Sequence, residues 1–133
     1  MTTTPRLRVG DTPPDRVVGP VTLTDIVRFA GAGGDFNPLH HDVIAARASG
    51  FPDVIAMGQF QAALLAGLLG DWVGVENVVE FSVRFRSPLV VRDEVRLAAA
   101  VVDVDPTATL VDLTATVGDR IVVSASARVR LPD

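Results

Sequence analysis

Cysteine is absent from this chain of 133 residues, and histidine occurs only twice. The absence of cysteine excludes disulfides, thiolate nucleophiles and cysteine-ligated metal sites together. It also means that cysteine usage says nothing about the redox compartment. No cluster of ligand side chains stands out, so neither a metal nor a redox cofactor is expected.

Excess positive charge and a long apolar run are lacking as well. The formal net charge is −4, which gives no basic surface for nucleic acid. The longest strongly apolar stretch, Ala62 to Leu69, is far shorter than the roughly 20 residues of a membrane-spanning helix. Residues 1–6 lack the charged-then-apolar pattern of a secretory signal. We therefore expect a cytoplasmic protein with no nucleic-acid or membrane partner.

What the chain does contain is enough apolar material for one core. Apolar residues make up 48% and charged residues 21% of the sequence, a composition that argues against disorder. The length fits one compact unit, and neither an internal repeat nor a low-complexity linker is visible. Residues 1–133 are expected to form a single domain.

The first half of the chain predicts loops and short helices. Prolines at positions 13, 14 and 20 break regular structure near the start. Thr22 or Thr24 is a candidate N-cap for a short helix over 25–30, which the glycines at 31, 33 and 34 should end. Residues 34–40 predict a turn-rich loop because Asn37-Pro38 disfavours helix. A second short helix is expected from about 42 to 48.

One longer helix is predicted over residues 58–72, where almost every position is apolar. A helix that is apolar all round is expected to be buried. Its small residues would let a sheet pack close to the helix backbone; they are Ala62, Ala63, Ala66 and Gly67.

The second half predicts antiparallel strands. Residues 79–86 alternate strictly, with apolar side chains at the odd positions, which is typical of a strand with one buried face. Further strands are predicted over 95–104, 110–117 and 121–131, the last two joined by a hairpin at Gly118-Asp119. In the last strand we expect Ile121 and every second residue after it to point inward. A buried helix followed by antiparallel strands indicates an α+β layout with the sheet wrapped around the helix.

Asp35 and His40 are the strongest candidates for chemistry. They lie five residues apart in a loop that contains proline, where two side chains can converge on one point. A carboxylate beside an imidazole can hold its tautomer, raise its basicity and share a bound water. The spacing alone leaves another interpretation open, in which Asp35 caps a turn and His40 lies on the surface.

The run from Phe29 to Asp42 resembles the hydratase-2 motif of the MaoC-like family. The matching core reads Gly-Asp-Phe-Asn-Pro-Leu-His-His-Asp, from residue 34 to residue 42. The resemblance continues through Gly50-Phe51, residues 55–58, residues 83–85 and Ser87-Pro88, and so covers nearly the whole chain. Similar proteins include (R)-specific enoyl-CoA hydratases, dehydratase subunits of mycolic-acid elongation and steroid side-chain hydratases. The resemblance implies a hot-dog fold, in which an antiparallel sheet wraps a central helix.

The family implies roles for individual residues. Asp35 and His40 would activate water for attack at C3 of a trans-2-enoyl thioester, with His40 as the main base, and would return a proton at C2. The backbone N–H of Gly58, at the start of the central helix, would bind the thioester oxygen as its negative charge develops. The family often has His-Gly where this chain has Met57-Gly58, and methionine cannot supply that hydrogen bond. This departure puts activity or substrate choice in doubt.

Other polar residues near the motif have simpler interpretations. Asn37 is expected to organise the loop through local backbone hydrogen bonds, and Asp42 to cap the following helix with His41 exposed. The arginines of the strand half could meet the phosphates of CoA or of a carrier protein's phosphopantetheine, although arginines on an outer strand face are usually only solvated. These candidates are Arg84, Arg86 and Arg92.

The sequence therefore predicts a hydratase or dehydratase that interconverts trans-2-enoyl and (R)-3-hydroxyacyl thioesters of CoA or acyl carrier protein. The resemblance implies a homodimer, or a heterodimer with a second hot-dog subunit. Two alternatives remain open: a hot-dog thioesterase, and an acyl-binding, weakly active or inactive subunit of a heteromeric dehydratase.

Overall fold

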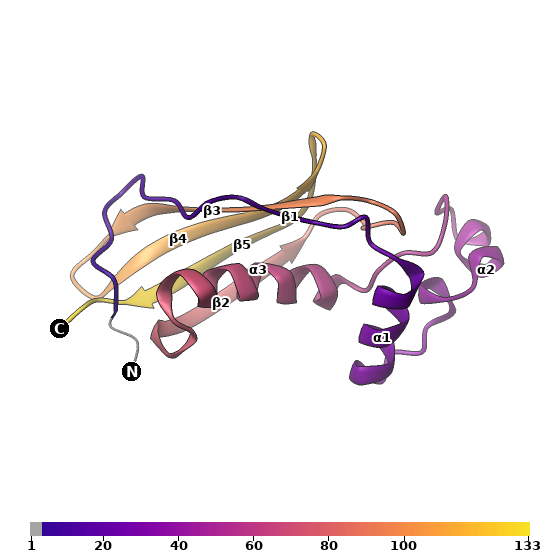
Figure 1. The fold of residues 1–133 in the computed structure, drawn as a ribbon, viewed down its shortest axis with the longest axis horizontal. Coiled ribbons are helices and arrows are strands. Elements are labelled where there is room, and N and C mark those ends of the chain that lie inside the picture. The colour runs from indigo at the N-terminus through magenta and orange to yellow at the C-terminus, as the bar shows by residue number, and fades with distance from the viewer. Residues whose placement is uncertain (1–3) are drawn as a thin grey trace.

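The computed structural model describes residues 4–133, which place an antiparallel sheet over one long helix (Figure 1). The strands are β1 (Arg16–Val18), β2 (Val78–Phe85), β3 (Val95–Val104), β4 (Ala108–Val117) and β5 (Arg120–Arg130). The helices are α1 (Leu23–Gly33), α2 (Val43–Ala48) and α3 (Gly58–Val73), with 3₁₀ turns at Pro38–His40 and Val75–Asn77. The α+β layout predicted from the sequence is confirmed.

The sheet order is β1-β3-β4-β5-β2, and every pairing is antiparallel. The hairpin between β4 and β5 has the predicted two-residue connection, in which Gly118 adopts a φ of 57°. Such a positive φ costs glycine little because it lacks a Cβ. Strand β2 lies at one edge of the sheet, and β1, a short strand between the predicted proline breaks, lies at the other. The sequence pattern gave no sign of β1.

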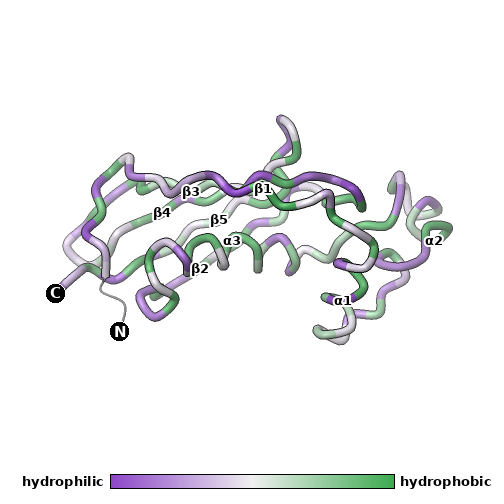
Figure 2. The backbone as a smooth tube through the Cα atoms, viewed as in Figure 1, coloured by the Kyte–Doolittle hydropathy of each residue, from purple (hydrophilic) through white to green (hydrophobic). Residues whose placement is uncertain are grey.

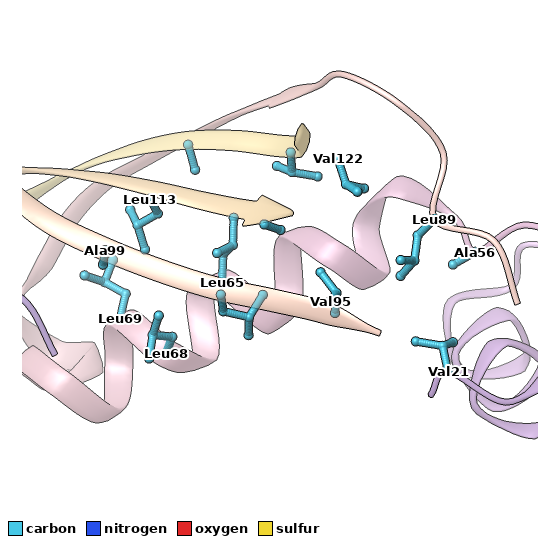
Figure 3. Close-up of a cluster of buried hydrophobic side chains, with 14 of the residues drawn as sticks. Val21, Ala56, Leu65, Leu68, Leu69, Leu89, Val95, Ala99, Leu113 and Val122 are labelled. Atoms are coloured by element: carbon cyan, nitrogen blue, oxygen red, sulfur yellow. The ribbon is translucent and has the colours of Figure 1, made fainter. Parts of the chain in front are cut away.

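The core lies between α3 and the concave face of the sheet (Figure 3). Leu65, Leu68 and Leu69 on α3 are at most 2% exposed and face strand residues such as Val95 and Leu113. Burying a leucine side chain contributes about 2 kcal/mol. This packing therefore fixes the position of α3, whose first turn forms part of the site described below.

Helix α3 is not buried on every side, contrary to the sequence prediction. Figure 2 shows apolar residues along much of it, yet Ala63, Ala66 and Gly67 are exposed. The sheet covers one face of the helix only, so three of the four small residues point away from it, while Ala62 alone is buried. Within residues 4–133, no helix has the length and apolar character needed to cross a membrane.

Two strands depart from strict alternation. In β2 the apolar residues near the two ends, Val79 and Phe85, are 66% and 51% exposed instead of buried, and the register shifts between residues 78 and 80. In β5 the predicted inward residue Ile121 is 45% exposed, while Val122 is fully buried beside Val123. A register shift opposite this point, between residues 115 and 116 of β4, explains the change, because one extra residue reverses which side chains face inward.

Thr22, not Thr24, is the N-cap of α1. The helix continues through Gly31 and Gly33, which were expected to end it, and its C-cap is Gly34 in the left-handed conformation. The Thr22 side chain accepts a hydrogen bond from the Asp25 N–H, and the Asp25 carboxylate accepts one from the Thr22 N–H. These reciprocal bonds satisfy two backbone donors of the first turn. The hydrogen bond from the Thr22 backbone lowers the pKa of Asp25.

We expect Thr22→Ala to lower the free energy of unfolding by about 1 kcal/mol, because it removes a capping hydrogen bond. Thr24→Ala is the matched control: Thr24 is exposed in the same turn and makes no cap. Urea denaturation of both variants measures the difference. Equal destabilisation by the two substitutions would contradict the assignment of the cap.

Candidate active site

The loop after α1 is held by its own backbone and side chains. The Asp35 N–H donates to the Ala30 carbonyl at 2.9 Å, and the Asn37 N–H donates to the Asp35 carboxylate at 3.3 Å. Asn37 Oδ1 in turn accepts from the Leu39 N–H at 3.0 Å and begins the 3₁₀ turn that carries His40. These contacts aim Asp35 and His40 in fixed directions from one short segment.

His40 is 6% exposed, and its Nδ1 lies 2.8 Å from the backbone carbonyl of Ile55. A carbonyl oxygen only accepts hydrogen bonds, so Nδ1 must carry the hydrogen. The neutral ring then presents the lone pair of Nε2 on its other side. That Nε2 lies 3.3 Å from Oδ2 of Asp35, so the structure brings the two predicted residues together.

The contact between Asp35 and His40 requires a shared hydrogen. Neutral Nε2 and an ionised carboxylate are both acceptors and repel each other when they face directly. The arrangement is stabilised by a proton on the imidazole, which forms an ion pair, or by a water that donates one hydrogen to each acceptor. The Asp35 side chain is 45% exposed, whereas that of His40 is 8% exposed, so water reaches the pair from the Asp35 side.

Helix α3 begins next to this pair without a side-chain cap. Its N-cap is Met57, which makes no capping hydrogen bond. Phe60 donates its N–H to the Met57 carbonyl at 2.9 Å, but the first N–H groups of an α-helix have no partner within the helix. The 16 residues of α3 also place the positive end of their dipole here. The first turn therefore offers donors and a favourable field to an anionic oxygen.

A cavity of about 430 Å³ joins these features. Asp35, Gly58 and Phe85 line it, together with residues of the segment before α3 and the end of β2. His40 does not line the cavity and reaches it through the Asp35 carboxylate. The remaining lining residues are Ile55, Ala56, Met57, Gln59, Gln61, Arg86, Ser87 and Pro88. The lining of one cavity therefore includes both the carboxylate and the first turn of α3.

The segment before α3 is fixed on both sides. The Ile55 N–H donates to the Leu39 carbonyl at 3.1 Å, and the Ala56 N–H donates to the Leu89 carbonyl at 2.8 Å. Asp53 accepts from the Val54 N–H and pairs with Arg92 at 2.6 Å, and these two interactions lower the pKa of Asp53, the first more strongly. The start of α3 is therefore tied to the loop that carries His40.

The three candidate phosphate-binding arginines occupy different places. Arg86 lines the cavity, and its Nε donates to Ser124 Oγ at 3.0 Å. Arg84 and Arg86 also line a hollow of about 420 Å³ on the outer face of the sheet. Arg92 pairs with Asp53 and lines neither space. Only Arg86 thus connects the cavity to the outer surface.

Near the helices, Asp42 accepts hydrogen bonds from the backbone N–H groups of residues 44 and 45 and caps α2, while His41 is exposed. Both interpretations made from the sequence agree with this geometry. Within residues 4–133, no three His, Asp or Glu side chains are grouped as a metal site would require.

Among the cavity residues that the sequence reasoning missed, two shape the site. Gln61 is buried one turn into α3, and Phe85 covers Gly58 from the edge strand. The spacing of three residues between Gly58 and Gln61 could have placed Gln61 on the site face of the helix. No local signal predicts Phe85, because its contact with Gly58 joins segments far apart in the sequence.

Solved structures define the class of this fold. The (R)-hydratase from A. caviae, involved in PHA biosynthesis, superposes with a TM-score of 0.84 at 28% identity, and the match covers 95% of this chain and 98% of that one. A five-stranded antiparallel sheet around a central helix is the hot-dog fold.

The sequence comparisons identify the family within that class. A model of the MaoC like domain matches residues 6–121. The (R)-specific enoyl-CoA hydratase of Aeromonas caviae is 34% identical over 113 residues, 81% of this chain and 84% of that protein. The 3-hydroxyacyl-thioester dehydratase X of Mycobacterium tuberculosis is 44% identical over 77 residues, 58% of this chain but 27% of that longer protein. The chain belongs to the MaoC-like domain family.

Position 58 favours glycine because the ring of Phe85 lies close to its backbone. A Cβ at this position would lie 2.7 Å from Cε1 and 2.8 Å from Cδ1 of the Phe85 ring. We expect Gly58→Ala to lower the free energy of unfolding by roughly 1–2 kcal/mol, because the ring must move. In a Phe85→Ala background the same substitution should be neutral or stabilising, since the obstacle is gone and alanine favours helix.

Thermal or urea unfolding of the two single variants and the double variant measures this coupling. Gly67→Ala is the matched control on the same helix: its Cβ would meet no atom within 4 Å, and it should stabilise by about 0.5–1 kcal/mol. Additive effects of Gly58→Ala and Phe85→Ala would show that the ring does not restrict this position.

Proposed function

We propose that this protein is a hydratase/dehydratase that interconverts trans-2-enoyl and (R)-3-hydroxyacyl thioesters of CoA or acyl carrier protein. The observation that carries the proposal is the pairing of Asp35 with His40 at 3.3 Å on a cavity that also contains the uncapped start of α3. Hydration needs a base beside a water and, across the substrate, a donor for the thioester oxygen. The relatives named as enoyl-CoA hydratases and dehydratases support the same reaction class.

Asp35 and His40 act on the water. A water that donates one hydrogen to the Asp35–His40 pair loses that proton as its oxygen forms a bond to C3 of the enoyl group. The π electrons of the double bond move toward the thioester, and the pair then donates a proton to C2. In the dehydration direction the same pair removes the C2 proton and protonates the leaving hydroxyl. His40 is the main base because its Nδ1 hydrogen bond to Ile55 keeps Nε2 free to accept.

Gly58 acts on the thioester oxygen. Its backbone N–H belongs to the first turn of α3, where, among residues 4–133, neither the helix nor a capping side chain supplies a partner. A preorganised donor of this kind contributes about 3 kcal/mol to transition-state stabilisation. Met57 leaves this donor unoccupied, whereas a serine or aspartate at the N-cap would compete for the N–H groups of the first turn.

Arg86 is the best placed of the three arginines for a phosphate of the CoA or phosphopantetheine group, because it lies where the cavity meets the outer surface. Strand β2 leaves one backbone edge without a partner among residues 4–133, with Val79 and Phe85 exposed along it. An unpaired edge with apolar side chains favours pairing with another strand. A second hot-dog subunit, identical or different, is the partner we propose for it.

Two other functions remain as alternatives. A weakly active or inactive acyl-binding subunit of a heteromeric dehydratase is favoured by Met57, which replaces the histidine often found there. A thioesterase is the other alternative, because hot-dog folds also host thioester hydrolysis, but the loop Asp-Phe-Asn-Pro-Leu-His over residues 35–40 argues against it. The two differ in their products, since only a thioesterase releases a free thiol.

The test follows absorbance at the enoyl-thioester band with short, long and steroid-like enoyl-CoAs. We expect hydration by the wild type, and a loss of about 10²-fold to 10⁴-fold in kcat for Asp35→Asn and for His40→Ala, because each removes part of the acid–base pair. His41→Ala is the matched control, since this neighbouring histidine is exposed and does not line the cavity.

Hydration at the wild-type rate by either site variant would contradict the mechanism. Release of free thiol in step with loss of substrate would establish the thioesterase instead. A wild type that is inactive alone but active with a co-purified hot-dog subunit would establish the heteromeric alternative.

A further inference from the structure

Gln61 carries a buried polar group without a partner. The residue is 2% exposed, and among residues 4–133 no group forms a hydrogen bond with its Oε1. Two other buried polar side chains are paired: His40 Nδ1 bonds the Ile55 carbonyl, and Asn77 Nδ2 donates to the Val73 carbonyl at 2.7 Å. Buried side-chain oxygens are normally hydrogen-bonded because burial removes them from water. The unpaired oxygen of Gln61 therefore needs a hydrogen-bond donor that residues 4–133 do not provide.

The position of Gln61 identifies where that donor comes from. Gln61 lies three residues after Gly58, on the same face of α3, and lines the cavity that Asp35 and Gly58 also line. Long side chains on a helix point toward its N-terminus, which brings the carboxamide back toward the first turn. Rotation of the carboxamide exchanges its oxygen and nitrogen in place, so its acceptor can be turned to a ligand in the cavity.

We propose that Gln61 binds the reacting oxygen, first as water and then as the C3 hydroxyl, by accepting the hydrogen that is not transferred. This inference rests on the proposed hydratase function and deepens it. Water has two hydrogens: one moves to the Asp35–His40 pair, and the other stays on the oxygen throughout. When Gln61 Oε1 accepts the second hydrogen, a lone pair of the reacting oxygen points at C3 during hydration. During dehydration that lone pair points at the protonated Asp35–His40 pair.

The atoms and electrons balance without another reactant. A lone pair of the water oxygen forms the bond to C3, and the π pair of C2=C3 moves into the enolate. The Asp35–His40 pair, which took the first proton, returns it to C2. Gln61 exchanges no proton, so its role is to orient the oxygen and to distinguish a hydroxylated acyl group from a saturated one.

Gln61→Met tests this role, because methionine matches the length of glutamine but accepts only weak hydrogen bonds. We expect the variant to bind (R)-3-hydroxybutyryl-CoA about tenfold more weakly than the wild type does, while binding of butyryl-CoA stays within twofold. Its kcat for crotonyl-CoA hydration should fall by at least about tenfold, since the water is no longer oriented. Its melting temperature should rise, because an unpaired buried carboxamide is removed.

Calorimetry with the two thioesters, the hydration assay and thermal unfolding are measured on the same preparations. Leu65→Met is the matched control: it places methionine one turn further along α3, in the core and outside the cavity lining. It should leave both affinities and kcat unchanged. Gln61→Leu repeats the comparison if the methionine variant does not fold.

Equal weakening of both thioesters, or an unchanged kcat, would overturn the inference and leave the proposed function standing. A lower melting temperature with unchanged selectivity would show that Gln61 serves only the packing of α3. Failure of the proposed function is recognised separately, by wild-type protein that hydrates no enoyl-CoA or by hydration that survives in Asp35→Asn and His40→Ala.

Discussion

The hydrogen bond between Nδ1 of His40 and the carbonyl of Ile55 is the contact on which the rest of the site depends. It joins the loop after α1 to the segment that leads into α3, and it fixes the tautomer of a buried ring. The same segment is held to Leu39 and Leu89 by backbone hydrogen bonds, so the position of His40 and the start of α3 are set together. Asp35 faces the free nitrogen as a consequence.

Polar groups without partners gather on one cavity. The start of α3 has no side-chain cap, Asp35 and Nε2 of His40 face each other and need a shared hydrogen, and the buried oxygen of Gln61 has no partner among residues 4–133. The uncapped helix and the buried oxygen lower stability, and the packing of the helix against the sheet compensates. Locally unfavourable groups that share one place are typical of a site built for a ligand that supplies the missing partners.

The sequence predicted the larger elements because their signals are local. The apolar run located the long helix to within one residue of its end, the Gly118-Asp119 turn located the hairpin, and the Asn-Pro turn located the loop of Asp35 and His40. Predictions failed where tertiary contacts decide the outcome. The short strand β1 exists because β3 pairs with it. The inward face of β5 changes at Val122 because this residue is an extra one opposite the consecutive β4 residues Ala115 and Thr116. The exposed face of α3 follows from a sheet that covers one side only.

The sequence by itself determined the membership of the chain in its family, the α+β layout and the identity of the two residues that now face each other. Those features depend on residue type and spacing, which need no knowledge of distant contacts. The tertiary structure alone decided that Nδ1 of His40 is the donor, that Phe85 crowds Gly58 and that Gln61 lies buried beside the same cavity. Each of these joins or exposes groups through packing between separate segments, and such packing is settled only when the sheet closes over the helix.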